Sequence, residues 1–227
     1  LVLGPLLAKY KKAKISLPGG CAIGSRPVNL HLFALKKLGA KIKIKNGYII
    51  AEAKNGLSGA NISFPDISVG ATENALLAAF YASGKTVLRN CAIEPEIKDL
   101  IKFLNVLGGK IKVAGRKILI IGCKKIKKKI KHRVIFDRIE LGTYMIAAAL
   151  VGKKIIFEKV DPKIIKTEID VLKKMGVQLK IKKTTIEIFK TNNVKKINVT
   201  TKPYPGFPTD LQAQLMVLMT RAKGVSK

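Results

Sequence analysis

The stretch ALKKLGAKIKI at residues 34–44 decides the fold, because one glycine joins the end of a helix to an alternating strand. Apolar residues first recur at helical spacing, the glycine suits the left-handed position that ends a helix, and Lys and Ile then alternate as in a strand. The same pattern returns as FLNVLGGKIKV at residues 103–113 and as VLKKMGVQLKI at residues 171–181. The three glycines, which lie 69 and 68 residues apart, are Gly39, Gly108 and Gly176. The chain therefore contains a repeat of about seventy residues.

A second pattern, made of apolar helices, alternates with the first. Helices are predicted at residues 72–83, 143–151 and 210–223, and a glycine follows each of them. A helix that is apolar on nearly all sides is a buried one, so we expect α/β units that pack around their helices. In this register the chain begins inside a helix and stops before the strands of its last unit. We therefore expect an internal fragment of a longer protein.

The length of 227 residues suits one large domain or two small ones, and 48% hydrophobic residues suffice for a sizeable core. No apolar run approaches the roughly 18 residues of a membrane span, so no membrane partner is expected. The three cysteines include no Cys-x-x-Cys pair, which excludes a disulfide framework or a zinc finger. This sparse cysteine content fits a reducing compartment and predicts a cytoplasmic protein.

The net charge of +30, from 44 basic and 14 acidic residues, first suggests a nucleic-acid partner. Only six of the basic residues are Arg, whose planar fork is favoured for recognising phosphate and guanine. The Lys residues are spread along the chain together with many Ile and Asn, all of which have A/T-rich codons. We attribute the charge to a biased genome and expect no dedicated nucleic-acid partner. Weak, salt-dependent and non-specific binding is compatible with this interpretation.

Three segments contain candidate functional residues. The loop LPGGCAIGSRPVNLH at residues 17–31 places Cys21 near a cation, where a thiol can act as an acid or a nucleophile; the alternative is a buried structural cysteine. In SVGATEN, residues 68–74, the start of a helix offers either a phosphate cradle of backbone N–H groups or an ordinary helix cap. In PYPGFPTDLQAQ, residues 203–214, Asp210 is either a general base or a helix cap, and the residues alone favour the cap.

The other chemistry-bearing residues have structural interpretations. Cys91 and Cys123 lie in strand-like contexts, and the Asp137–Arg138 pair is typical of a helix start. The basic tract at residues 124–133 is interpreted as a solvated edge strand or a linker rather than a polyanion site. The two histidines, His31 and His132, have no Cys or carboxylate at metal-ligand spacing. No metal site and no cofactor are therefore expected.

Five motifs, taken together and in this order, resemble the UDP-N-acetylglucosamine enolpyruvyl transferase (UDP-N-acetylglucosamine 1-carboxyvinyltransferase) family. They are PGGCAIGSRPV (18–28), SVGATEN (68–74), EPEI (94–97), DRIE (137–140) and YPGFPTD (204–210). The resemblance covers essentially the whole chain. It implies the enolpyruvyl transferase fold, in which two inside-out α/β barrel domains of three repeats each bind the substrate in the cleft between them. Residues 1–136 would belong to the first domain, and residues 137–227 to an incomplete second one.

The resemblance also implies a reaction, the first committed step of peptidoglycan synthesis. An enolpyruvyl group passes from phosphoenolpyruvate to the 3′-hydroxyl of UDP-N-acetylglucosamine, and phosphate is released. These two small molecules are the expected partners. Cys21 matches the family's general acid and Asp210 its general base, while His31 matches a supporting residue. The residues that match the nucleotide contacts are Arg26, Pro27, Val28, Asn29 and Leu30, and those that match backbone contacts to the diphosphate are Ser68, Val69 and Gly70.

The sequence departs from the family pattern at several points. Asn29 stands where the family usually has Asp, which leaves an amide in place of a carboxylate. Asp66 aligns near a position where some members have a nucleotide-contacting Lys, so we assign Asp66 no such role. The family's Lys-Asn pair and Arg before this stretch, and its Arg-bearing segment after it, help to bind phosphoenolpyruvate and are absent. We therefore expect this chain alone to be inactive.

Two alternatives stay open. The enolpyruvyl transferase of the shikimate pathway has the same architecture, but it lacks the catalytic cysteine that Cys21 matches. The other alternative is an inactive basic remnant that binds nucleic acid without specificity. Family members with a cysteine in this loop are alkylated by fosfomycin, so the resemblance predicts the same reaction at Cys21 of the complete enzyme.

Overall fold

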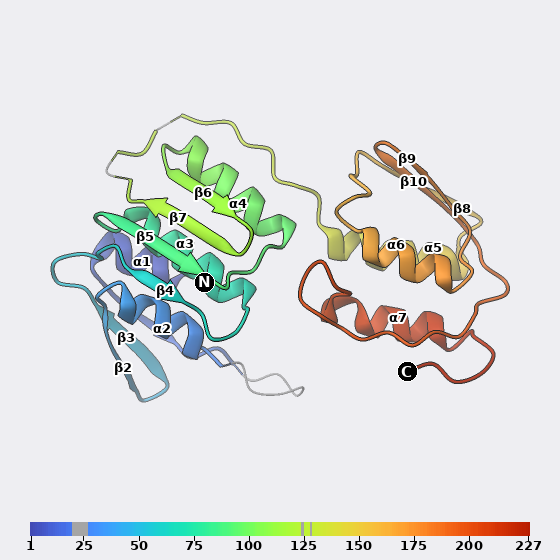
Figure 1. Cartoon of the computed structure of the whole chain (residues 1–227). Coiled ribbons are helices and arrows are strands. Elements are labelled where there is room, and N and C mark those ends of the chain that lie inside the picture. The colour runs from blue at the N-terminus through green and yellow to red at the C-terminus, as the bar shows by residue number, and fades with distance from the viewer. Residues whose placement is uncertain (20–26, 124, 128) are drawn as a thin grey trace. The chain divides into compact units, whose positions relative to one another are not determined.

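The computed structural model describes residues 1–19, 27–123, 125–127 and 129–227. The chain forms two compact units, Leu1–Val134 and Ile135–Lys227, each with its own hydrophobic core. Figure 1 shows that each unit contains both helices and sheets. This content confirms the predicted α/β class. The units divide two residues before the domain boundary that the resemblance implies.

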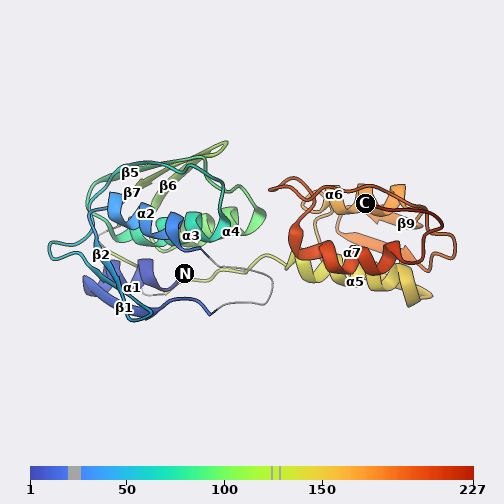
Figure 2. The same cartoon turned by 90° about the horizontal axis from the view of Figure 1, so that it is seen from below.

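The first unit combines four helices with two sheets among the described residues. The helices are α1 (Leu3–Tyr10), α2 (Asn29–Lys37), α3 (Val69–Tyr81) and α4 (Pro95–Val106). The strands are β1 (Lys12–Ser16), β2 (Lys41–Lys45), β3 (Tyr48–Glu52), β4 (Asn61–Ser63), β5 (Lys85–Arg89), β6 (Lys110–Ala114) and β7 (Lys117–Ile121). One sheet has the order β1-β3-β2 and the other β4-β5-β7-β6, and all pairs except β4 with β5 are antiparallel. Helix α3 packs against α1, α2 and α4 and against β7, so it lies between α1 and the four-stranded sheet (Figure 2).

The second unit is smaller and contains one described sheet. Its elements are α5 (Arg138–Val151), β8 (Lys154–Glu158), α6 (Lys166–Lys174), β9 (Leu179–Lys182), β10 (Thr185–Phe189), the 3-10 helix η1 (Thr209–Leu211) and α7 (Gln212–Met219). The antiparallel strands have the order β8-β10-β9. Helix α5 packs against β10 and β8 on the sheet side and against α7 on the other (Figure 1).

The glycines of the sequence pattern end three helices in the predicted way. Gly39, Gly108 and Gly176 have φ angles of 97°, 114° and 84°, in the left-handed region that glycine adopts without a steric cost. The next residue then donates its backbone N–H to the carbonyl five residues earlier. These pairs are Ala40 to Leu35, Gly109 to Leu104 and Val177 to Leu172. Each turn leads into two antiparallel strands, so the local helix–glycine–strand prediction is confirmed.

The sheets remain separate over the part of the chain that the structure describes. They comprise two three-stranded sheets and one four-stranded sheet, and none of them closes on itself. The inside-out barrel of repeated units therefore stays a prediction.

The apolar helices differ from their predicted bounds because of their caps. Helix α3 begins at Val69 rather than residue 72, since Ser68 caps it, and α5 begins at Arg138 rather than residue 143, since Asp137 caps it. Helix α7 ends at Met219, four residues before the predicted end. Its Met216 and Val217 are exposed, so this helix does not have the all-round burial that we expected for the apolar helices.

Candidate functional site

The start of helix α3 presents unpaired backbone donors. The Ser68 hydroxyl accepts a hydrogen bond from the N–H of Ala71 at 3.2 Å, and the N–H of Thr72 bonds to the Ser68 carbonyl. Ser68 is therefore a helix cap, as one of the two interpretations proposed. Among the described residues, the N–H groups of Val69 and Gly70 have no hydrogen-bond partner. Two open N–H groups at the positive end of a 13-residue helix favour an anionic ligand.

The Thr72 side chain fixes this helix start against the segment between β5 and α4. Its hydroxyl donates to the Ser68 carbonyl at 2.8 Å and accepts from the backbone N–H of Ala92 at 3.1 Å. Thr72 is completely buried, and its hydrogen bond with Ala92 is shielded from water. The direction of the two open N–H groups is consequently set by buried structure.

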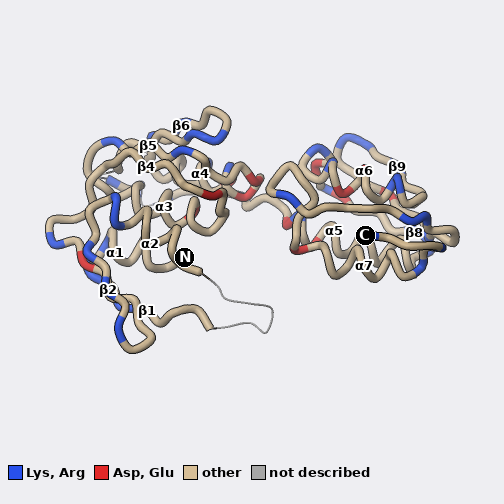
Figure 3. The backbone as a smooth tube through the Cα atoms, turned by 60° about the horizontal axis from the view of Figure 1, so that its bottom comes forward, with Lys and Arg blue, Asp and Glu red and all other residues tan. Residues whose placement is uncertain are grey.

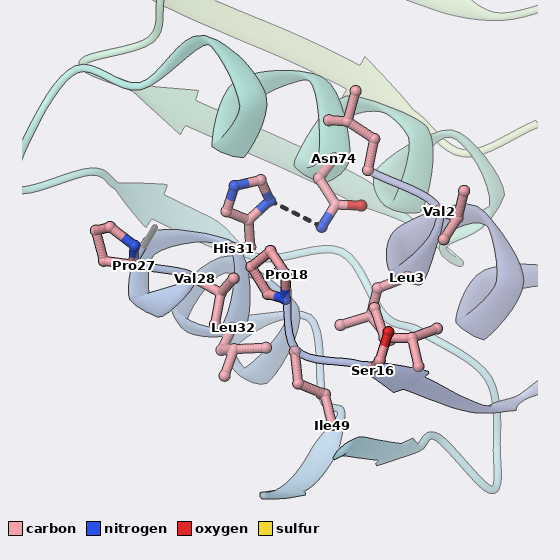
Figure 4. A pocket seen from close by; sticks show the side chains of 12 residues that line it. Val2, Leu3, Ser16, Pro18, Pro27, Val28, His31, Leu32, Ile49 and Asn74 are labelled. Carbon is pink, nitrogen blue, oxygen red and sulfur yellow. Dashed lines mark hydrogen bonds between the residues drawn. The ribbon is translucent and has the colours of Figure 1, made fainter. Parts of the chain in front are cut away.

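A pocket of about 410 Å³ lies in the same unit, between α1, α2 and β1 (Figure 4). Its polar side chains are Ser16, His31 and Asn74, and the rest of its lining is apolar. Pro27 and Val28, two of the residues matched to nucleotide contacts, also line it. His31 comes from α2 and Asn74 from α3, so this pocket joins the two segments that the motifs single out.

The other matched residues of the first segment lie at the start of α2. Asn29 is the first residue of this helix and is exposed, whereas Leu30 is partly buried against the core. Asp66 is exposed and precedes the Ser68 cap by two residues. Cys21 and Arg26 lie outside the described residues.

Burial shifts the pKa values of two side chains at this helix: His31, which lies beside it, and Glu73, which lies on it. The pKa of His31 is lowered, mainly because the ring is half-buried. The pKa of Glu73 is raised, first by burial and then by repulsion from Glu96. The His31 ring is therefore more easily kept neutral near pH 7 than a free histidine.

Asp210 lies in the second unit, on the 3-10 helix η1, and its side chain is exposed. Neither η1 nor α7 has a hydrogen bond from a capping side chain, so the interpretation of Asp210 as a helix cap is wrong. The next residue, Leu211, is completely buried and packs against Gly142 of α5, where even a methyl group would lie 2.4 Å from Leu211 Cδ1. This contact anchors the backbone that presents the Asp210 carboxylate.

Three structural interpretations of the sequence are confirmed. Cys91 is completely buried, and this burial raises the pKa of its thiol to about 12. Asp137 caps α5 by accepting the N–H groups of Ile139 and Glu140 at 2.8 and 3.1 Å. The described residues of the basic tract form neither helix nor strand, which fits the linker interpretation.

The described residues include no group of three or more His, Cys, Asp or Glu side chains that could hold a metal ion. No helix in the described ranges is long and apolar enough to cross a membrane.

Asn74 is the residue that the sequence analysis missed. It lies inside the SVGATEN motif, but we assigned it no role. Its side chain is only 1% exposed, and it bonds to the His31 ring and to the backbone N–H of Gly4. A buried amide in an otherwise apolar helix needs partners, so its position in the helix interior was the available signal.

Comparisons with known proteins identify the class. Residues 1–227 match the sequence model of the family described as EPSP synthase (3-phosphoshikimate 1-carboxyvinyltransferase). Among solved structures, the enolpyruvyl transferase NikO from Streptomyces tendae is similar with a TM-score of 0.80 and 21% identity, over 97% of this chain and 53% of that chain. EPSP synthase from Acinetobacter baumannii is similar with a TM-score of 0.61 and 21% identity, over 96% of this chain and 49% of that one. The fold is thus that of the enolpyruvyl transferases, and the chain belongs to the EPSP synthase family.

Curated relatives with a higher sequence identity share the name of one specific enzyme. The chain is 58% identical over 223 residues to UDP-N-acetylglucosamine 1-carboxyvinyltransferase of Pelagibacter ubique (strain HTCC1062), which covers 98% of this chain and 53% of that protein. It is 53% identical over 227 residues to the protein of the same name from Endomicrobium trichonymphae. This alignment covers 100% of this chain and 54% of the relative. The chain spans about half the length of the curated relatives it matches.

Proposed function

We propose that the chain is part of a UDP-N-acetylglucosamine 1-carboxyvinyltransferase, which transfers an enolpyruvyl group from phosphoenolpyruvate to the 3′-hydroxyl of UDP-N-acetylglucosamine. The observation that supports this most is the 58% identity to a protein of that name across 98% of the chain. The five motifs of the sequence support the same substrate pair. The reaction starts peptidoglycan synthesis, so the enzyme would serve cell-wall biogenesis, cell shape and division.

The first unit would bind the nucleotide sugar. The diphosphate would accept hydrogen bonds from the open N–H groups of Val69 and Gly70, beside the Ser68 cap. The uridine nucleotide would contact residues 26–30. Two features support this placement: Pro27 and Val28 line the pocket that His31 also lines, and a methyl group on Gly70 would lie 3.2 Å from the His31 ring.

The chemistry would be an addition followed by an elimination. Asp210 would take the proton of the 3′-hydroxyl, whose oxygen then forms a bond to the central carbon of phosphoenolpyruvate, while Cys21 gives a proton to the methylene carbon. Loss of a proton from the new methyl group and departure of phosphate would restore the double bond. The exposed side chain of Asp210, which caps no helix, is consistent with a role as base. No cofactor enters this scheme.

The enzyme would work in the cytoplasm on these two small molecules, without a dedicated nucleic-acid partner. Lys and Arg residues occur on many elements of both units instead of gathering on one element (Figure 3). This distribution supports the interpretation that the high charge reflects composition rather than a binding surface.

A direct comparison of two acceptors tests the proposed function. The complete enzyme is given phosphoenolpyruvate together with either UDP-N-acetylglucosamine or shikimate 3-phosphate, and released phosphate is measured. We expect release with the nucleotide sugar only, and no release from the 227-residue chain alone. Release with shikimate 3-phosphate only would establish the shikimate-pathway alternative, and no release with either acceptor would establish the inactive remnant.

The diphosphate site has its own test in Gly70→Ala. Gly70 does not have a positive φ, so the substitution adds a methyl group without backbone strain, but that group meets the His31 ring. We expect UDP-N-acetylglucosamine to bind more weakly in calorimetry, with a melting temperature close to that of the parent chain. Unchanged affinity would contradict the placement of the diphosphate beside Gly70.

A further inference from the structure

The amide of Asn74 has only one possible orientation. Its Oδ1 lies 2.8 Å from the backbone N–H of Gly4, in a buried position. A backbone N–H only donates, so the atom that faces it must be the amide oxygen and not the nitrogen. Gly4 permits this close approach because it has no side chain: a methyl group there would lie 2.4 Å from Oδ1.

This orientation decides where the His31 proton sits. The Nδ2 of Asn74 lies 3.2 Å from Nδ1 of His31, and the amide NH₂ group only donates. Nδ1 must therefore accept this hydrogen bond and have no proton of its own. A neutral imidazole has one ring proton, which is then on Nε2. The low pKa of His31 agrees with a ring that is neutral near pH 7.

The protonated nitrogen faces away from Asn74 and toward the start of α3. Figure 4 shows the second ring nitrogen of His31 on the side opposite the hydrogen bond. A methyl group on Gly70 would lie 3.4 Å from Nε2, so this N–H is close to the residue that offers an open backbone N–H. His31 would therefore add a side-chain donor to the two backbone donors.

We propose that Asn74 is a positioning residue, which holds His31 in the Nε2–H tautomer so that its ring donates a hydrogen bond to a diphosphate oxygen of UDP-N-acetylglucosamine. The ligand in this inference rests on the proposed function, whereas the tautomer rests on the contacts with Gly4 and Asn74 alone. The two parts are therefore tested separately.

The tautomer is measured by NMR on the 227-residue chain with ¹⁵N-labelled histidine, and a His132→Gln variant assigns the two rings. We expect His31 to have its proton on Nε2. Asn74→Asp keeps the acceptor for Gly4 but replaces the NH₂ donor by a carboxylate oxygen, which favours a proton on Nδ1. We expect this variant to have the Nδ1–H tautomer, in which Nε2 has no proton to donate.

Asn105→Asp is the matched control for the tautomer. Asn105 also bridges two backbone groups, the N–H and the carbonyl of Ile111, and it lies on α4. The same change of amide to carboxylate there should leave the His31 signals as they are in the parent chain. A parent ring protonated on Nδ1 would overturn the proposal, and this measurement does not depend on whether a variant folds. A folded Asn74→Asp variant with the parent tautomer would also overturn it.

Binding of UDP-N-acetylglucosamine is measured by calorimetry on the same variants. A hydrogen bond to a charged oxygen typically changes affinity by about 10- to 100-fold, so Asn74→Asp should lose that much. His31→Gln removes the imidazole ring whose tautomer Asn74 would set. In that background Asn74→Asp should therefore lose much less affinity than in the parent.

Equal losses in both backgrounds would show that Asn74 acts without His31 and would overturn its positioning role. If the parent chain has the Nε2–H tautomer but does not bind UDP-N-acetylglucosamine, the ligand of the proposal is wrong while the tautomer assignment stands. That outcome counts against the proposed diphosphate site and is distinct from a wrong tautomer.

Discussion

The hydroxyl of Ser68 accepts the N–H of Ala71 and so satisfies one of the donors that open at the start of α3. Two further donors, on Val69 and Gly70, stay open among the described residues. From the sequence, Ser68 could be either a helix cap or part of an anion site. The geometry shows that a capping Ser68 is compatible with an anion site at Val69 and Gly70. A side-chain cap uses one N–H and leaves others for a ligand.

The cysteines provide a prediction at the residue scale. If Cys21 is the general acid, fosfomycin should alkylate its thiol in the complete enzyme, and peptide mass spectrometry should find the adduct on the Cys21 peptide. Cys91 is the control within the same chain, because its pKa of about 12 keeps it a buried thiol near pH 7 and only a thiolate is an effective nucleophile. An unmodified Cys21 peptide, or an adduct on Cys91, would contradict the proposed role.

The helix–glycine–strand elements were the most predictable part of the fold, because their signals are local. The left-handed glycine, the apolar periodicity before it and the alternation after it lie within eleven residues, as at 34–44. Helices α3 and α5 begin before their predicted starts because the apolar pattern begins only after the cap. Ser68 and Asp137 show that the cap, rather than the first apolar residue, marks the boundary.

A carboxylate at the centre of the β8-β10-β9 sheet provides a prediction at the element scale. Glu187 on β10 bonds to Lys182 at 2.9 Å and to Lys154 at 3.1 Å. These two ammonium groups, Lys182 first, lower the pKa of Glu187 below its ordinary value of 4.5. The unfolded state consequently binds a proton more readily than the folded state. The ion pairs stabilise the fold fully above the ordinary pKa, and their contribution is lost as pH falls through the lower, folded-state value.

Glu187→Gln should therefore unfold at lower urea concentration than the parent chain at pH 7, and the difference should vanish at a pH below the folded-state pKa. Unfolding curves from pH 7 down to the lowest pH at which the chain stays folded measure this. Glu158→Gln is the matched control, because Glu158 is exposed at the end of β8 and has no ion pair among the described residues. A difference for Glu187→Gln that is the same at every pH would show that packing, rather than charge, causes it.

At the scale of the whole molecule, the sequence does not predict contacts between residues that are far apart along the chain. The SVGATEN motif indicated a site, but the bond between Asn74 and His31 joins residues 43 positions apart and is set by the packing of α2 against α3. The contact between Asn74 and Gly4 spans 70 positions. Strand order has the same origin in part. The pairing of β3 with β2 is a hairpin that the turn at Asn46 and Gly47 indicates locally, whereas no local pattern of residues specifies the pairing of β3 with β1.

The segment that connects the two units provides the last prediction. Between β7 and α5 the described residues form no helix or strand, and Lys125, Lys127, Lys129, Lys131 and Arg133 are exposed. Each unit has its own core, so a cut between them should leave both units folded. Brief trypsin treatment of the 227-residue chain should therefore cut first within residues 125–133, and mass spectrometry should find two persistent fragments.

A protease specific for Glu is the control, because residues 122–136 contain no acidic residue and should not be cut. First cuts inside the Lys-rich strands β2 or β9 would show that those sheets open more readily than the connecting segment, and would contradict the division into two independently stable units.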